Sequence, residues 1–108
     1  MVLSKARIAR TEAPNGVRIE GEIDLANADE LEAVLRDALP GGQITVDLHD
    51  LSFIDSSGLH AILRVATDPQ NTAPIRLVGA SRHVRNLLEV VGVADLPTLD
   101  IDGGGVDG

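Results

Sequence analysis

The strongest constraint on the fold is a change of apolar spacing in the middle of the chain. Residues 48–54 form an apolar, strand-like run, and apolar residues with helical spacing follow the polar segment Asp55-Ser56-Ser57-Gly58. Such a change indicates a strand that leads directly into a helix. Unpaired backbone N–H groups and the helix dipole favour an oxygen atom or a negative charge at a helix start. Ser56 is therefore either an ordinary helix cap, which local chemistry alone favours, or a hydroxyl where a phosphate can be accommodated.

The remaining apolar pattern also alternates between strand and helix. Short β-branched segments at 2–8 and 17–23 flank Pro14-Asn15-Gly16, which has turn chemistry, so we expect an N-terminal β-hairpin. Helical spacing predicts a helix over 25–38 with an apolar face formed by Leu25, Ala28, Leu31, Leu35 and Ala38. Further strands are expected at 44–48 and 75–78 and at the edge over 96–99, and further helices from Ser56 to Ala66 and from the cap Ser81 to Gly92.

This order of elements predicts an α/β (α+β-like) domain. Strands separated by helices favour parallel pairing through right-handed crossovers, whereas the hairpin adds an antiparallel pair. We therefore expect a small mixed sheet of four to five strands with about three helices. A single domain over residues 1–99 is expected to precede a flexible, acidic, Gly-rich tail at 100–108.

Composition narrows the range of partners. The 108 residues suffice for one domain, and one Phe with no Trp or Tyr predicts an aliphatic core. A net charge of −8 and the lack of aromatic stacking platforms argue against direct nucleic-acid binding. No apolar run approaches the ~20 residues that span a bilayer, so no membrane contact is expected. The absence of cysteine excludes disulfides, and residues 1–10 do not resemble a signal peptide, so we expect a cytoplasmic protein.

The sequence offers little support for catalysis or for a metal. His49, His60 and His83 lack the close spacing of metal ligands, so we assign no metal and no cofactor. A nucleophilic serine needs a base and an oxyanion hole, and Ile54 stands where the Gly-x-Ser-x-Gly motif has its first glycine. Gly41-Gly42 lacks the Lys-Ser or Lys-Thr of a phosphate-binding loop. We therefore expect no enzyme activity.

Two junction motifs resemble a known family. Gly21-Glu22-Ile23-Asp24 precedes the first long helix, and Asp47-Leu48 followed by residues 53–59 precedes the second. With the order of elements from about residue 4 to residue 99, these motifs resemble the STAS domain, specifically the bacterial anti-sigma-factor antagonists. The resemblance implies the STAS fold, with the helices packed mainly on one face of the sheet.

The resemblance also implies a function. In such antagonists the first serine of the Asp-Ser-Ser-Gly motif, here Ser56, is phosphorylated by the anti-sigma factor, an ATP-dependent serine kinase. The unphosphorylated antagonist binds the anti-sigma factor and thereby releases a sigma factor, and a phosphatase is a further partner that such a switch allows. We expect a monomer or weak dimer. The expected partner-binding residues are Glu22, Asp24, Asp55, Ser56, Ser57, Gly58, Leu59 and His60.

Several of these assignments have alternatives. Asp24 would also serve as the N-cap of the helix over 25–38, and Gly58 would also meet a packing requirement. His60, four residues after Ser56, would pair with a phosphate when protonated or simply face solvent. Many family members continue into another C-terminal helix, which is not expected here. The alternative function is a STAS subunit of a transporter or of another multiprotein complex, without phosphorylation.

Overall fold

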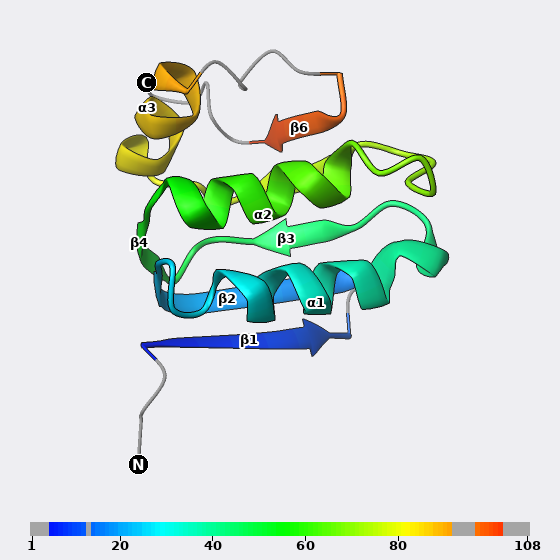
Figure 1. Cartoon of the computed structure of the whole chain (residues 1–108), viewed down its shortest axis with the longest axis horizontal. Coiled ribbons are helices and arrows are strands. Elements are labelled where there is room, and N and C mark those ends of the chain that lie inside the picture. The colour runs from blue at the N-terminus through cyan, green and yellow to red at the C-terminus, as the bar shows by residue number, and fades with distance from the viewer. Residues whose placement is uncertain (1–4, 13, 92–96, 103–108) are drawn as a thin grey trace.

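The computed structural model describes residues 5–12, 14–91 and 97–102, and Figure 1 shows the elements in order. The strands are β1 (Ala6–Thr11), β2 (Gly16–Ile23), β3 (Thr45–Asp47), β4 (Leu51–Ile54), β5 (Ile75–Val78) and β6 (Leu99–Asp102). The α-helices are α1 (Ala28–Ala38), α2 (Ser56–Ala66) and α3 (Arg82–Val90), with a 3₁₀ turn, η1 (Leu39–Gly41), after α1. The mixed α/β class predicted from the sequence is confirmed.

All six described strands belong to one sheet with the order β1-β2-β3-β5-β6, and β4 pairs with β2. The β1–β2 pair is antiparallel, whereas β2, β3, β5 and β6 run parallel. β3 pairs with the first part of β2, from Gly16 to Arg18, and β4 pairs with its last part, from Gly21 to Ile23. We expected four to five strands. The described part of the chain has six because a turn at His49 and Asp50 separates β3 from β4, so that two short strands pair with successive parts of β2.

The expected hairpin and first helix are present with shifted ends. β1 extends to Thr11 because its pairing with β2 continues as far as the turn, and residues 2–4 of the expected first strand lie outside the described residues. α1 begins at Ala28 instead of Leu25, because residues 24–27 form a separate hydrogen-bonded turn. Leu25, predicted to lie on the buried helix face, is 79% exposed.

The C-terminal elements also differ in their ends. The Ser81 hydroxyl accepts a hydrogen bond from the Val84 N–H at 3.2 Å, which confirms the predicted cap of α3. β6 begins at Leu99, where we expected the last strand to end, and it uses the first residues of the expected tail. The reason is that Leu99 and Ile101 alternate toward the core opposite Ile75 and Leu77 of β5. Gly92 and residues 103–108 lie outside the described residues.

The two faces of the sheet have opposite character. Figure 1 shows α1 and α2 side by side over one face of the sheet. The β2 side chains on this face, Val17, Ile19 and Ile23, are fully buried. The intervening residue Arg18 is exposed on the other face, where its guanidinium pairs with Glu20 and Asp50. The buried side chains are almost all aliphatic, as the composition predicts. None of the helices in the described part of the chain has the length and apolar character needed to cross a bilayer.

Candidate functional site

α2 begins with an aspartate cap. The Asp55 carboxylate accepts hydrogen bonds from the backbone N–H groups of Ser57 at 2.8 Å and Gly58 at 3.3 Å. The Asp55 N–H donates to the Ile23 carbonyl at 3.1 Å, which ties the helix start to the end of β2. Asp55 is thus the cap, and Ser56 is the first residue of the helix. Two of the N–H groups that attract an anion to a helix start are therefore already bonded to a carboxylate.

Ser56 is exposed to solvent. Within the described residues its hydroxyl has no hydrogen-bond partner. Another protein can therefore reach this hydroxyl without breaking an internal contact. A phosphate on Ser56 would add negative charge beside Asp55 and would leave the cap in place.

Gly58 and Leu59 lie beneath this surface. A Cβ atom on Gly58 would lie 2.6 Å from Ile23 Cγ2 and 2.7 Å from Ile54 Cγ1, so glycine allows α2 to approach β2 and β4 closely. Leu59 is 2% exposed and belongs to the core. The packing interpretation of Gly58 is confirmed. Both residues support the site from below, and neither forms part of its exposed surface.

A hydrogen-bonded turn at residues 24–27 lies next to the start of α2. The Asp24 carboxylate accepts from the Ala26 N–H at 2.9 Å and lies 3.3 Å from Lys5 Nζ. The Asp24 carbonyl accepts from the N–H groups of Asn27 at 3.2 Å and Ala28 at 2.9 Å. Asp24 therefore closes a turn that precedes α1, and the alternative in which it caps the helix directly is wrong. The residue before α1 is Asn27, whose side chain makes no cap bond to the helix.

Asn27 holds this turn from the inside. Its side chain is buried, its Oδ1 accepts from the Asp24 N–H at 2.9 Å, and its Nδ2 donates to the Glu22 carbonyl at 2.9 Å. Neither Asn27 nor Lys5 was predicted as a site residue. The hairpin register would have suggested Lys5, because the Glu22 N–H donates to the Lys5 carbonyl at 3.0 Å. Asn27 lies in an ordinary apolar–polar helical pattern and gives no signal in the sequence.

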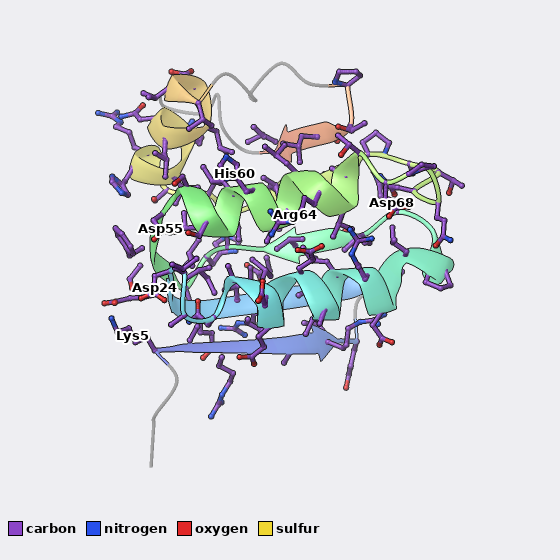
Figure 2. The ribbon with its side chains drawn as sticks, in the orientation of Figure 1. Lys5, Asp24, Asp55, His60, Arg64 and Asp68 are labelled. Atoms are coloured by element: carbon purple, nitrogen blue, oxygen red, sulfur yellow. The ribbon has the colours of Figure 1, made fainter. Side chains whose placement is uncertain are left out.

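The exposed and half-buried predicted residues gather at one end of the molecule. Figure 2 shows Asp24, Asp55 and His60 on the side where β2 and β4 end and α2 begins. His60 is exposed one helical turn after Ser56, and Glu22 is exposed opposite Phe53 of β4. In the part of the chain that the structure describes, no three metal-ligating side chains gather into a cluster. We call the following residues the site surface: Glu22, Asp24, Asp55, Ser56, Ser57 and His60.

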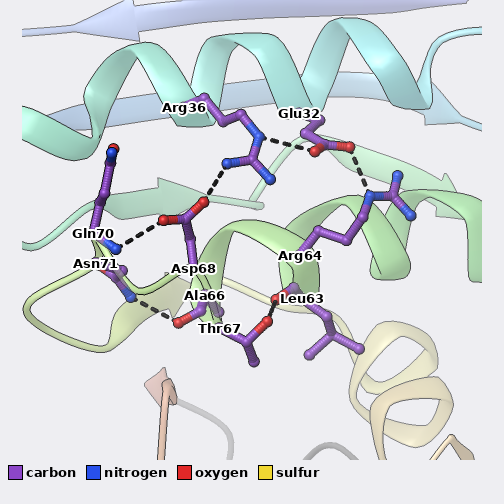
Figure 3. A network of polar contacts seen from close by, with 9 residues as sticks. All are labelled: Glu32, Arg36, Leu63, Arg64, Ala66, Thr67, Asp68, Gln70 and Asn71. Atoms are coloured by element: carbon purple, nitrogen blue, oxygen red, sulfur yellow. Dashed lines mark hydrogen bonds and ion pairs between the residues drawn. The ribbon is translucent and has the colours of Figure 1, made fainter.

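A polar network holds α2 against α1 away from Ser56 (Figure 3). Glu32 of α1 accepts from Arg64 Nε of α2 at 2.8 Å and from Arg36 Nε at 2.9 Å. Arg36 also donates to Asp68, just beyond α2, at 2.6 Å. The hydrogen bond from Arg64, supported by Arg36, lowers the pKa of Glu32, and the Gln70 N–H together with Arg36 lowers the pKa of Asp68. We call these four residues, Glu32, Arg36, Arg64 and Asp68, the interhelix network.

Sequence comparison assigns the chain to a family. The chain matches the family model described as "Mlab, STAS domain" over residues 6–99. The Bordetella bronchiseptica protein named "Putative anti-sigma factor antagonist BtrV" is 34% identical over 77 residues, which cover 68% of this chain and 66% of BtrV. The chain therefore spans slightly less than two thirds of the length of this relative.

Solved structures share the fold. An anti-sigma factor antagonist from Mycobacterium paratuberculosis superposes with a TM-score of 0.68 at 18% identity, over 89% of this chain and 82% of that one. Bacillus SpoIIAA in its phosphorylated form gives a TM-score of 0.61 at 20% identity, over 89% of both chains. The anti-sigma factor antagonist SpoIIAA in its unphosphorylated form gives 0.56 at 22% identity, over 78% of this chain and 81% of that one. With the family model matched over residues 6–99, the chain belongs to the STAS domain family.

Proposed function

We propose that this protein is an anti-sigma factor antagonist that binds a serine-kinase anti-sigma factor through the site surface and is released when the kinase phosphorylates Ser56. The observation that carries the proposal is the exposed Ser56 hydroxyl, which begins α2 and has no hydrogen-bond partner among the described residues. The name of BtrV supports an antagonist function. SpoIIAA, which shares the fold, has been solved in both an unphosphorylated and a phosphorylated form.

In this function the chain is a substrate and a binding partner, not an enzyme. Transfer requires Ser56 Oγ to reach the γ-phosphorus of ATP held by the kinase. A bond forms between Oγ and phosphorus, the bond from phosphorus to the bridging oxygen of ADP breaks, and the hydroxyl proton passes to a base of the kinase. Because Ser56 is exposed, no internal contact of the chain is broken in this step. The reaction takes place in the cytoplasm, where sigma factors act.

The phosphate then acts at the partner surface and leaves the fold largely unchanged. It adds about 1.5 to 2 negative charges beside Asp55. Since the Asp55 carboxylate already accepts from Ser57 and Gly58, the phosphate stays outside the helix start. In the complex it occupies the space that the γ-phosphate of a second ATP requires. Overlap and repulsion between like charges therefore weaken binding, and a phosphatase restores the active antagonist.

The test is phosphate transfer in a purified system. The chain is incubated with ATP and a candidate ATP-binding anti-sigma factor from the same organism, and tandem mass spectrometry then locates the phosphate. We expect one phosphate on Ser56, none on Ser56→Ala, and normal modification of Ser56 in the control Thr72→Ala, which removes an exposed hydroxyl outside the site surface. Ser56→Asp should bind the kinase more weakly than Ser56→Ala. A phosphate on another residue, or no phosphate at all, contradicts the proposal.

A second candidate is a STAS subunit that binds a transporter or another complex without phosphorylation. The matched family model is described only as "Mlab, STAS domain", and this description agrees with either function. The two functions differ in the role of Ser56. A constitutive subunit should bind its partner equally well as Ser56→Ala and as wild type, and no kinase should modify it.

A further inference from the structure

We infer that Leu25 is an apolar anchor that enters a pocket of the anti-sigma kinase next to the phosphorylation site. This inference rests on the proposed function and adds a residue that sequence reasoning had placed in the core. Leu25 is 79% exposed and is the large apolar side chain of the turn that flanks the start of α2. Leaving a leucine in water forgoes its hydrophobic burial, so a partner that covers it recovers a substantial free energy.

The turn presents Leu25 on a fixed backbone. Before Leu25 in the chain, Asp24 accepts hydrogen bonds from the N–H groups of Ala26 and Ala28. After Leu25, the buried side-chain amide of Asn27 accepts from the Asp24 N–H and donates to the Glu22 carbonyl. The ion pair between Lys5 and Asp24 adds a link to the residue before β1. Because the backbone on both sides of Leu25 is already ordered, binding costs little further conformational entropy.

The anchor is continuous with the site surface. The Asp55 N–H donates to the carbonyl of Ile23, and Ile23 also packs beneath Gly58. Leu25 follows Ile23 by two residues, and Figure 2 shows Asp24 and Asp55 close together at this end of the molecule. A kinase that reaches the Ser56 hydroxyl therefore extends over this turn.

Charge defines the chemistry of the partner. Asp24 belongs to the turn, and Figure 2 shows Asp55 close to it. Glu22 is exposed at the end of β2, two residues before Asp24, and the net charge of the chain is −8. Lys5 offsets the charge of Asp24 only in part, because the Lys5 side chain remains 62% exposed. The complementary kinase surface is an apolar pocket bordered by lysine or arginine side chains. The apolar contact sets the dissociation rate, whereas the charges set the association rate and its dependence on salt.

The binding experiment uses the kinase that phosphorylates Ser56, with the full chain immobilised. Leu25→Ser should bind about ten- to a hundredfold more weakly, mainly through faster dissociation, whereas Leu25→Met should stay within about threefold of wild type. The matched control is Val90→Ser, because Val90 is 81% exposed at the end of α3 and should not affect binding. Glu22→Gln should reduce the salt dependence of the association rate, whereas Leu25→Ser should leave that dependence unchanged. Unchanged melting temperatures show that all variants fold.

Failure of the anchor can be distinguished from failure of the function. If Leu25→Ser binds the kinase as tightly as wild type and Ser56 is still phosphorylated, the anchor is wrong and the proposed function stands. If no kinase modifies Ser56, the anchor is tested by photo-crosslinking in the native cell. Benzoylphenylalanine is placed at position 25 and, as a control, at position 90. A crosslink from position 25 alone to an ATP-binding anti-sigma factor supports the anchor. A crosslink to any other protein, or none, overturns it.

Discussion

The polar side chains at the two ends of the molecule are used in opposite ways. At the end opposite Ser56, Asn15 Nδ2 donates to the carbonyls of Ala38, Gly42 and Gln43 at 2.8, 3.1 and 3.3 Å. Its Oδ1 accepts from Arg10 at 2.8 Å. One side chain thus ties the hairpin turn to the end of α1 and to the segment that enters β3.

At the site end, by contrast, three exposed side chains lack such partners. The hydroxyl of Ser56 and the imidazole of His60 have no hydrogen bond among the described residues, and Leu25 faces solvent. The backbone beneath them is nevertheless well bonded through Asp55 and Asn27. The comparison separates residues that hold the fold from residues that are free to contact a partner. Substitutions at the two ends should therefore affect different measurements.

The largest effect on stability is expected from Asn15→Ala. This change removes the donors to three carbonyls, one of them that of the buried Ala38, and places alanine at a φ of 53°. We expect the free energy of unfolding in urea to fall by about 2 to 3 kcal/mol. Kinase binding of the folded fraction should remain normal.

The control Asn15→Gly tolerates the positive φ but still loses the hydrogen bonds. Asn15→Gly should therefore be about 1 kcal/mol more stable than Asn15→Ala and still less stable than wild type. An Asn15→Ala protein as stable as wild type would show that the far end does not hold the fold in the way we describe.

Asp55→Ala tests a residue that both holds the fold and belongs to the site surface, and a smaller loss is expected. Removing the cap should cost about 1 kcal/mol and accelerate amide hydrogen exchange at Ser57 and Gly58. Asp55→Asn keeps an oxygen acceptor and should restore most of the stability, while it removes a negative charge beside Ser56. Equal instability of the two variants would mean that the charge, and not the hydrogen bonds, stabilises the helix start.

Sequence reasoning located the features that depend on neighbouring residues. The junction before Ser56, the cap at Ser81 and the hairpin turn at Asn15 all follow from local spacing and turn chemistry. For Gly58, predicted either to contact a partner or to meet a packing requirement, the closeness of Ile23 and Ile54 confirms the packing requirement. Such features can be predicted because the residues that cause them are adjacent in the chain.

Features that depend on distant pairings could not be found in this way. Leu25 matched the helical spacing of α1, but the Asp24 turn, held by Asn27, excludes it from the helix. Lys5 reaches Asp24 only because β1 and β2 pair in one particular register. β4 is a separate strand because it pairs with the last part of β2 beyond a shift in register. In each case a tertiary contact decides between local alternatives.

The smallest effect is expected from Glu32→Gln, which tests whether the interhelix network adds to stability in the way its geometry suggests. The Glu32 carboxylate joins α1 to α2 through Arg64 and also pairs with Arg36 of its own helix, and its side chain is 19% exposed. Exposed and half-exposed ion pairs contribute modestly, so the loss at neutral pH should be less than about 1 kcal/mol. The matched control Glu30→Gln removes the same charge from an exposed position of α1 and should have no comparable effect.

The pH dependence distinguishes this network from a simple change of net charge. The hydrogen bond from Arg64, with help from Arg36, holds the pKa of Glu32 below its ordinary value of 4.5 in the folded protein. The stabilisation is therefore fully present above the unfolded-state pKa and is lost as the pH falls through the lower folded-state pKa. In thermal melts, the difference between wild type and Glu32→Gln should be constant from pH 7 to about pH 5 and should shrink below about pH 4.5. A difference that grows on acidification would mean that Glu32 is not stabilised as a carboxylate and that its contacts with Arg36 and Arg64 do not hold the helices together.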